Sequence, residues 1–397
     1  MIEFASGVVF QMTLLLFVAL AGYLIALRIN QSAVVGIILV GIIVGPSLLG
    51  LITYTDFVAN IAELGAVVLL FVVGLEFKLQ DIAKGKYFVI GACGVIIPWL
   101  GGYGIAKLFG FSVGNAFIVA AALTATSIAI TANVLKEMGK LQSETAKAII
   151  ATAVIDDILA LVVLTISMNA ISGTLSFWPI GLIIVKAILF LAIGVVIGYI
   201  FVARLIVKLD RSKIATKYPE FVFILSLMFA FGYALIAEFI GLSAIVGAFL
   251  AGVCLEGITL KHSKSYREGS EYLYIVFASI FFVSLGVLTN VKAINVFIVI
   301  FLIALIIVAI ITKVIGCAIP SLLFGMKKKD ALIIGIGMVP RGEVAMIVAL
   351  LALNKNIIGQ DIYVSLVLMA LITTIITPFA LRKWFFRQEK RANIWTR

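Results

Sequence analysis

Charged side chains are scarce in this chain, and their scarcity excludes most kinds of protein. Only 12% of the 397 residues are charged and 64% are hydrophobic, with a mean hydropathy of +1.27. A soluble domain is about half apolar and about a quarter charged. The apolar residues run continuously, without the alternation that a membrane β-barrel needs. The composition therefore predicts an all-α membrane protein that lies in a lipid bilayer.

Residues that build metal centres and disulfide frameworks are also few. The three cysteines, Cys93, Cys254 and Cys317, lie in separate apolar runs without metal-ligand spacing. The single histidine, His262, lies in a basic loop, where we expect it to be solvated. Walker and zinc-protease motifs are absent from the sequence. Nothing in the sequence therefore suggests energy from nucleotide hydrolysis, and we expect neither a cofactor nor an enzyme activity.

Apolar segments near the length of a membrane-crossing helix follow one another along the chain. The sequence predicts about thirteen such helices, with twelve as the alternative because one turn is very short. The predicted segments are 5–27, 32–50, 59–77, 87–108, 114–138, 145–172, 178–203, 219–239, 241–258, 271–288, 292–324, 330–354 and 360–382. The first of them follows Met1 closely and lacks a cleavage site, so we expect a helix rather than a signal peptide.

Basic residues concentrate on one side of the predicted membrane. Most of the 30 lysines and arginines fall in loops after odd-numbered helices and in the tail from Arg382, whereas the opposite loops hold Lys107, Lys292 and Lys355. Because basic loops stay in the cytoplasm, we expect a cytoplasmic C-terminus, an external N-terminus and a place in the cytoplasmic membrane. The formal charge of +11 is then a topology signal and gives no support to nucleic-acid binding.

Two helices in the two halves of the chain resemble each other. Residues 33–41 read AVVGIILVG and residues 244–252 read AIVGAFLAG, with an offset of 211. Phe71-Val72 recurs at the same offset as Phe282-Val283. Seven helices separate the copies, so the second would enter the membrane from the opposite side. Inverted repeats of this kind are typical of secondary transporters, whose ion sites lie near the midplane.

Three charged residues fall in the middle of predicted helices. Asp156 and Asp157 are adjacent in 145–172, and Lys313 lies in 292–324. A charge at the bilayer centre costs several kcal/mol and therefore needs a partner or a function. Neighbouring helical residues point about 100° apart, so the two carboxylates face different surroundings. We interpret them as a site for protons and metal cations, with Lys313 as the counter-charge.

Two predicted helices contain an interruption at matching places. Thr124-Ala125-Thr126-Ser127 is rich in hydroxyls, and Pro340 lies between Gly335 and Glu343, where Arg341 adds a further charge. Thr126 and Gly337 are again 211 residues apart. Paired broken helices are typical of a transporter's ion site, because their free carbonyls bind cations. Glu76, at the end of helix three, is either an interfacial residue or a functional one.

These motifs together resemble the monovalent cation:proton antiporter-2 family, and among its members the NapA-type sodium/proton antiporters. The resemblance rests on Ala153–Asp157, Thr124–Ser127, Lys313 followed by Gly316, and Val339–Glu343. It covers essentially the whole chain. It implies the sodium/proton antiporter fold, with two inverted six-helix repeats and crossing broken helices, and it implies a homodimer.

The resemblance also implies a division of the chain and an elevator-like movement. Helices one to three and eight to ten would form the dimerisation domain, and the helices around the broken pair would form the moving core. The implied segments are 1–77, 78–172, 173–210 as linker, 211–290, 291–384 and the cytoplasmic tail 385–397. Exchange of Na⁺, and of Li⁺, for H⁺ would be electrogenic, because the chain has two aspartates rather than one.

The resemblance assigns roles to individual residues. Asp157 would bind the cation and Asp156 would pair with Lys313, which would carry a proton. Backbone near Thr126 would help coordinate the transported sodium, and Glu343 would lie near the lysine, with Arg341 as a second supporting charge.

Other functions remain alternatives. A K⁺/H⁺ antiporter would use a similar set of oxygen ligands, since carboxylate and backbone oxygens suit several hard cations. A sodium-coupled organic-acid symporter shares the fold but lacks the Asp-Asp and lysine set. An intramembrane aspartyl protease needs two carboxylates face to face, which neighbours on one helix do not provide. A channel or ion sensor is a further alternative. Proton counterflow distinguishes antiport from the last three.

Overall fold

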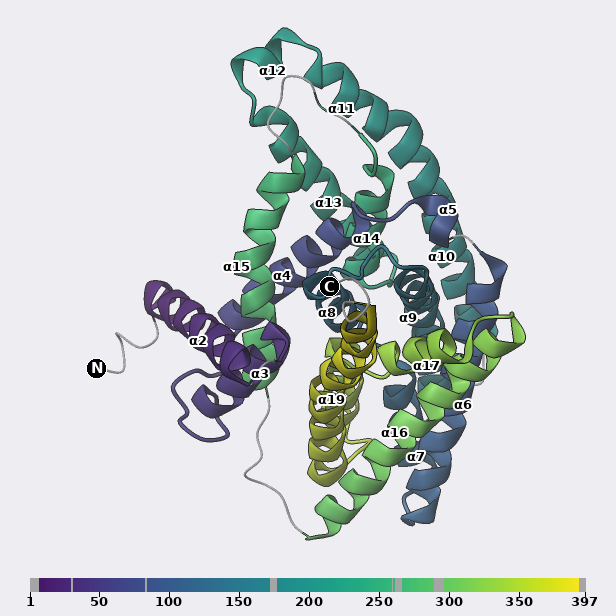
Figure 1. The fold of residues 1–397 in the computed structure, drawn as a ribbon. Coiled ribbons are helices and arrows are strands. Elements are labelled where there is room, and N and C mark those ends of the chain that lie inside the picture. The colour runs from purple at the N-terminus through teal and green to yellow at the C-terminus, as the bar shows by residue number, and fades with distance from the viewer. Residues whose placement is uncertain are drawn as a thin grey trace. The chain divides into compact units, whose positions relative to one another are not determined.

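A computed structural model of the chain describes residues 7–29, 31–82, 84–171, 177–258, 260, 266–288 and 296–392. All regular structure in this part of the chain is helical (Figure 1). Within it, ten helices are long and apolar enough to cross a membrane, and α3 (Ala33–Val44) and α14 (Ala244–Cys254) are shorter apolar helices. The prediction of an all-α membrane protein is confirmed. His262 lies outside the described residues.

The described residues form two compact units. The first comprises Met1–Leu16, Tyr54–Ala83 and Phe177–Ser284, and the second comprises Phe17–Thr53, Lys84–Ser176 and Leu285–Arg397. Each unit is therefore assembled from segments of both halves of the sequence.

The first unit contains a long helix with a local change of pitch. Its elements are α4 (Asp56–Gly74), α5 (Leu79–Ile82), α10 (Phe177–Ile197), the π-helical turn η1 (Gly198–Val202), α11 (Ala203–Asp210), α12 (Lys213–Lys217), α13 (Phe221–Phe239), α14 and most of α15 (Tyr266–Val287). The helix predicted over 178–203 continues to Asp210 rather than ending at a loop. A prediction from hydropathy ends the helix where the first charged residues appear. The chain nevertheless stays helical through α11, because Ile206 is buried while Arg204 and Lys208 face outward.

A tight turn separates α13 from α14, the pair on which the predicted helix count depended. Gly241 adopts a φ of +90°, a conformation that a residue with a Cβ rarely adopts. The Leu242 backbone N–H donates to Ala237 O at 2.8 Å, which closes the end of α13. Helices α13 and α14 are therefore two separate elements.

The second unit contains the two interrupted helices. Its elements are most of α2 (Val8–Arg28), α3, α6 (Gly85–Leu108), α7 (Val113–Thr124), α8 (Ile128–Glu137), α9 (Glu144–Ile171), α16 (Val296–Leu323), α17 (Lys328–Gly337), α18 (Glu343–Asn354) and α19 (Gln360–Ala392). The interruptions fall where the sequence predicts them, between α7 and α8 and between α17 and α18. Helix α3 ends at Val44 rather than near 50, because Gly45 and Pro46 follow it and a residue before proline disfavours the helical conformation.

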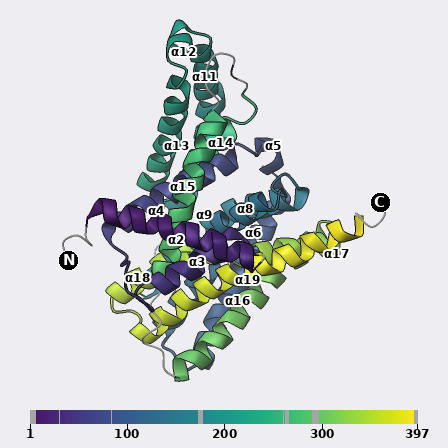
Figure 2. The ribbon, with the colours of Figure 1, turned by 60° about the vertical axis from the view of Figure 1, so that its left-hand side comes forward.

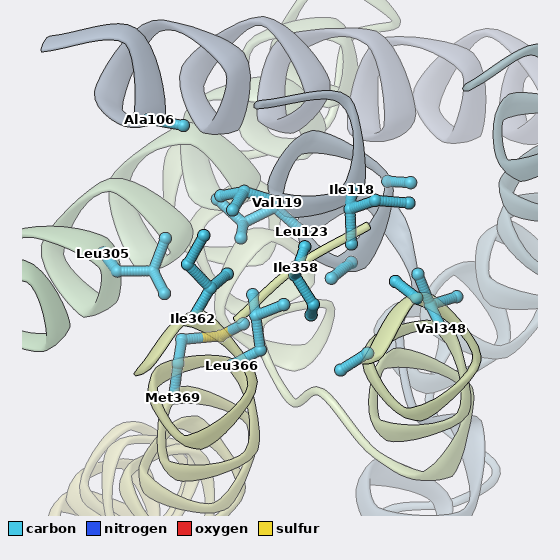
Figure 3. Packing of buried hydrophobic residues seen from close by; sticks show 14 of the residues in the cluster. Ala106, Ile118, Val119, Leu123, Leu305, Val348, Ile358, Ile362, Leu366 and Met369 are labelled. Carbon is cyan, nitrogen blue, oxygen red and sulfur yellow. The ribbon is translucent and has the colours of Figure 1, made fainter. Parts of the chain in front are cut away.

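One face of these broken helices is packed in an apolar cluster. Ile118, Val119 and Leu123 of α7 meet Leu305 of α16, Val348 of α18 and Met369 of α19 (Figure 3). Figures 1 and 2 both show α19 running beside α16. This packing holds α7 and α18 in position, so that the interrupted ends of the two broken helices meet.

Candidate ion-binding site

The two aspartates lie at the midpoint of α9, where the surroundings are apolar. Asp156 is 0% exposed and Asp157 is 7% exposed. Apolar residues on α9 hold the helix against its neighbours α6, α7 and α17. Because the side chains diverge by about 100°, Asp156 and Asp157 serve different contacts.

Lys313 of α16 lies against Asp156, as the counter-charge argument predicts. Its Nζ is 2.6 Å from Asp156 Oδ1, and both side chains are fully buried. The ammonium also donates to Gly94 O at 2.8 Å and to Thr124 O at 2.9 Å. These contacts use all three N–H groups of the lysine. A buried ion pair needs such additional hydrogen bonds to offset the cost of desolvation.

Helices α6 and α16 approach each other closely beside this ion pair. A Cβ added at Gly94 would lie 2.7 Å from Cys317 Sγ and 3.8 Å from both Lys313 Nζ and Asp156 Oδ1. A Cβ at Gly316 would lie 2.8 Å from Cys93 O. Both positions therefore require glycine, and Gly94 brings its carbonyl oxygen to the lysine.

The two helix breaks lie against each other and satisfy one another's free backbone groups. The Ser127 N–H donates to Pro340 O at 2.9 Å. The Thr131 hydroxyl donates to Gly337 O at 2.7 Å. The Thr126 hydroxyl donates to Met338 O at 3.1 Å and lies near the carboxylate of Asp156. The first break therefore brings Thr126 and the lysine-bound Thr124 carbonyl to the aspartate.

Arg341 places a second basic side chain in the same interior. The side chain is 0% exposed, and its Nη1 donates to Met338 O at 3.2 Å and to Val339 O at 2.8 Å. Its Nε and Nη2 have no hydrogen-bond partner within the described part of the chain. The guanidinium attracts the carboxylate of Asp156 and repels the ammonium of Lys313. Asp156 is thus attracted by two cations.

The backbone of Arg341 is anchored to α19. Its N–H donates to Thr373 Oγ1 at 3.3 Å, and its carbonyl oxygen accepts the Thr374 hydroxyl at 2.6 Å. These two threonines and Gly94 were not predicted from the sequence. Consecutive hydroxyls within an apolar helix were the available signal for Thr373 and Thr374.

The remaining predicted residues lie as follows. Glu343 is the first residue of α18, and its side chain lies outside the described residues. Glu76 lies in the first unit, where one oxygen is 3.9 Å from Arg267 Nη1, and Arg267 Nη2 donates to Leu75 O at 2.6 Å. A partly exposed ion pair of this kind is expected for an acidic residue at the membrane interface.

Comparison with known proteins gives the family. Residues 14–387 match the family model described as "Sodium/hydrogen exchanger, transmembrane". The chain belongs to the sodium/hydrogen exchanger family. This confirms the resemblance to cation:proton antiporters that the motifs predicted, and it identifies the chain as a multi-pass membrane transporter.

Relatives of full length support this assignment. The Na⁺/H⁺-K⁺ antiporter GerN of Bacillus cereus is 32% identical over 384 residues, covering 96% of this chain and 97% of that protein. A Na⁺/H⁺ antiporter of Enterococcus hirae is 31% identical over 386 residues, covering 96% and 98%. The electron-microscopy structure of the sodium proton antiporter MjNhaP1 of Methanocaldococcus jannaschii aligns with a TM-score of 0.71 at 16% identity, covering 94% of each chain. The chain therefore has the antiporter fold.

Proposed function

We propose that this exchanger moves Na⁺, and Li⁺, in exchange for H⁺, using Asp157, Asp156 and Thr126 to hold the cation. The observation that carries the proposal is the fully buried Asp156–Lys313 pair at the crossing of two broken helices. Charges are retained in a membrane interior where they have a function. Proteins of similar sequence named as Na⁺/H⁺ antiporters support the same choice.

Exchange follows from competition for the carboxylates. When Asp157 holds a proton, its charge is neutral and it has no electrostatic attraction for sodium. When the proton leaves, the carboxylate offsets the charge of the cation. Asp156 is drawn into coordination as sodium enters, and Lys313 then loses its counter-charge in a low-dielectric site. A buried ammonium without a partner is strongly destabilised, so release of its proton restores neutrality. More than one proton per sodium would make the transport electrogenic.

Glycine contacts in the two halves support an inverted repeat. A Cβ at Gly36 would meet the carbonyl oxygen of Gly22 on the preceding helix, and a Cβ at Gly247 would meet that of Tyr233 on its own preceding helix. Both the glycines and the oxygens are 211 residues apart. Gly286 similarly approaches Ile38 O, as Gly74 approaches Phe249 O, and Ile38 and Phe249 have the same separation.

This repeat is the basis for the architecture that we propose. Thirteen membrane helices would form two inverted six-helix repeats joined by the linker helix, with the N-terminus outside and the tail in the cytoplasm. The helices around the crossing would move as a core against the dimerisation helices of a homodimer, in an elevator-like cycle in the cytoplasmic membrane. Alternating access in folds built from inverted repeats proceeds by rigid-body movement of one bundle against another.

The test is a proteoliposome assay with an internal pH dye, challenged in turn with Na⁺, Li⁺ and K⁺. Proton counterflow with Na⁺ and Li⁺ supports the proposal. A response to K⁺ alone would favour the second candidate, K⁺/H⁺ exchange, which is consistent with the name of the Bacillus cereus relative, the Na⁺/H⁺-K⁺ antiporter GerN. Cation uptake without proton counterflow would contradict both.

A further inference from the structure

The C-terminal end of α8 is attached to α3 by one carboxylate. Oε2 of Glu137 accepts the Ser32 hydroxyl at 2.6 Å and the Ala33 N–H at 3.2 Å. Oε1 of Glu137 accepts Asn133 Nδ2 at 2.9 Å. Arg382 of α19 adds an electrostatic attraction. Both oxygens of Glu137 are thus engaged, although the side chain is partly open to solvent.

This contact replaces the usual cap of α3. Ser32 occupies the N-cap position of α3, but its hydroxyl accepts no bond from the helix. An N-cap serine ordinarily accepts a backbone N–H of the first turn. Here the serine hydroxyl donates to Glu137. The Glu137 carboxylate, rather than the serine, accepts a backbone N–H at the start of the helix, that of Ala33. A negative charge at a helix N-terminus is further stabilised by the helix dipole.

Helix α8 connects this contact directly to the ion site. Its ten residues, about 15 Å in length, begin next to the first helix break, where Ser127 bonds Pro340, and end at Glu137. Thr131, within α8, bonds Gly337 of the second break. Movement of the crossing along the membrane normal therefore carries Glu137 with it.

We propose that Glu137 is a positioning residue that latches the crossing to α3, and that the latch opens in every transport cycle. This rests on the proposed function, in which α8 belongs to the moving core and α3 to the stationary dimerisation helices. Opening removes the cap from Ala33 and uncovers Ser32, which is 1% exposed in the closed arrangement. The latch stabilises the conformation described here relative to the one in which the core has moved.

The test compares Glu137→Gln and Ser32→Ala with wild type in proteoliposomes. The matched control is Glu144→Gln, because Glu144 begins the next helix and its side chain is 75% exposed. Loss or weakening of a hydrogen bond to a charged group should change the KM for Na⁺ or the saturating rate by about tenfold or more, in the same direction for both variants. The double variant should show no larger change, since the residues act through one contact. The control should match wild type.

Thermal unfolding in detergent and hydrogen exchange of the peptide 31–40 complete the test. A latch that opens gives exchange at Ala33 that responds to Na⁺ in wild type and is fast, without a Na⁺ response, in Glu137→Gln. If the variants have lowered melting temperatures but wild-type KM, rate and Na⁺ response, Glu137 is only a static helix cap. That result would overturn the latch but would not contradict antiport. Absence of Na⁺-driven proton flux in wild type would overturn the antiport proposal and the latch with it.

Discussion

Lys313 Nζ lies 2.6 Å from Asp156 Oδ1, and neither side chain has solvent-exposed surface. The lysine's other two donors reach the carbonyl oxygens of Gly94 and Thr124, so the pair is joined to α6 and to the first helix break. A change in the charge or contacts of Asp156 would therefore act directly on the lysine, and through it on α6 and the first helix break.

Replacement of Lys313 by glutamine should remove the second proton. Wild-type flux should respond to membrane voltage, because more than one proton moves per sodium. If Lys313→Gln still binds sodium, its exchange should be electroneutral and insensitive to voltage. The measurement is sodium-driven flux in liposomes clamped at several potentials with potassium and valinomycin. Voltage-independent wild-type flux would refute electrogenic exchange, and unchanged voltage sensitivity in the variant would remove the lysine from the mechanism.

Breaking the ion pair from one side should cost more than removing it altogether. Lys313→Gln leaves Asp156 buried without its main counter-charge, a change that costs about 3–5 kcal/mol in buried pairs. Asp156→Asn combined with Lys313→Gln buries no lone charge of the pair and should recover most of the loss. Thermal unfolding in detergent of the single and double variants checks this. Equal losses for single and double variants would indicate that the pair does not interact as described.

Gly94→Ala should disrupt the site, whereas Gly104→Ala on the same helix should not. The added methyl at Gly94 would lie 2.7 Å from Cys317 Sγ and displace the carbonyl that binds Lys313, while a Cβ at Gly104 meets no atom within 4 Å. Overpacking of this kind costs about 1–3 kcal/mol. We expect lower exchange and lower thermal stability for Gly94→Ala alone. A wild-type result for both variants would show that the close approach is unimportant.

Asp157→Asn should abolish exchange while leaving the protein folded. The amide has nearly the same shape, but it neither releases a proton nor offsets the charge of a cation. Sodium-driven proton flux gives the activity, and the elution volume and melting temperature of the purified variant serve as controls. Robust flux in this variant would move the ion site elsewhere.

Much of the site could be predicted from the sequence because charge is so rare in these helices. Asp156, Asp157 and Lys313 each interrupt an apolar run, and Pro340 cannot continue a helix, so both their location and the second break were visible. The ends of the helices were less certain. Arg204 and Lys208 read as a loop, although α11 keeps them on the outward face of a continuing helix.

The contacts around these residues could not be predicted, for a physical reason. Lys313 donates to two backbone carbonyl oxygens. The hydroxyls of Thr131, Thr373 and Thr374 form hydrogen bonds with backbone groups of the second helix break. Every residue has a carbonyl and an N–H, so such bonds leave no distinctive pattern of residue types. The division into dimerisation and core domains and the ion-binding roles stay predictions, to be decided by experiment.

The central claim, that sodium and protons occupy one buried site in turn, is tested most directly by the pH dependence of sodium affinity. Proteoliposomes containing the wild-type protein would be titrated with Na⁺ at a series of pH values, with proton flux as the signal. Because a carboxylate holds one of the two ions at a time, the apparent KM for Na⁺ should rise steadily as the pH falls. A KM that stays constant over several pH units would contradict exchange at a shared site.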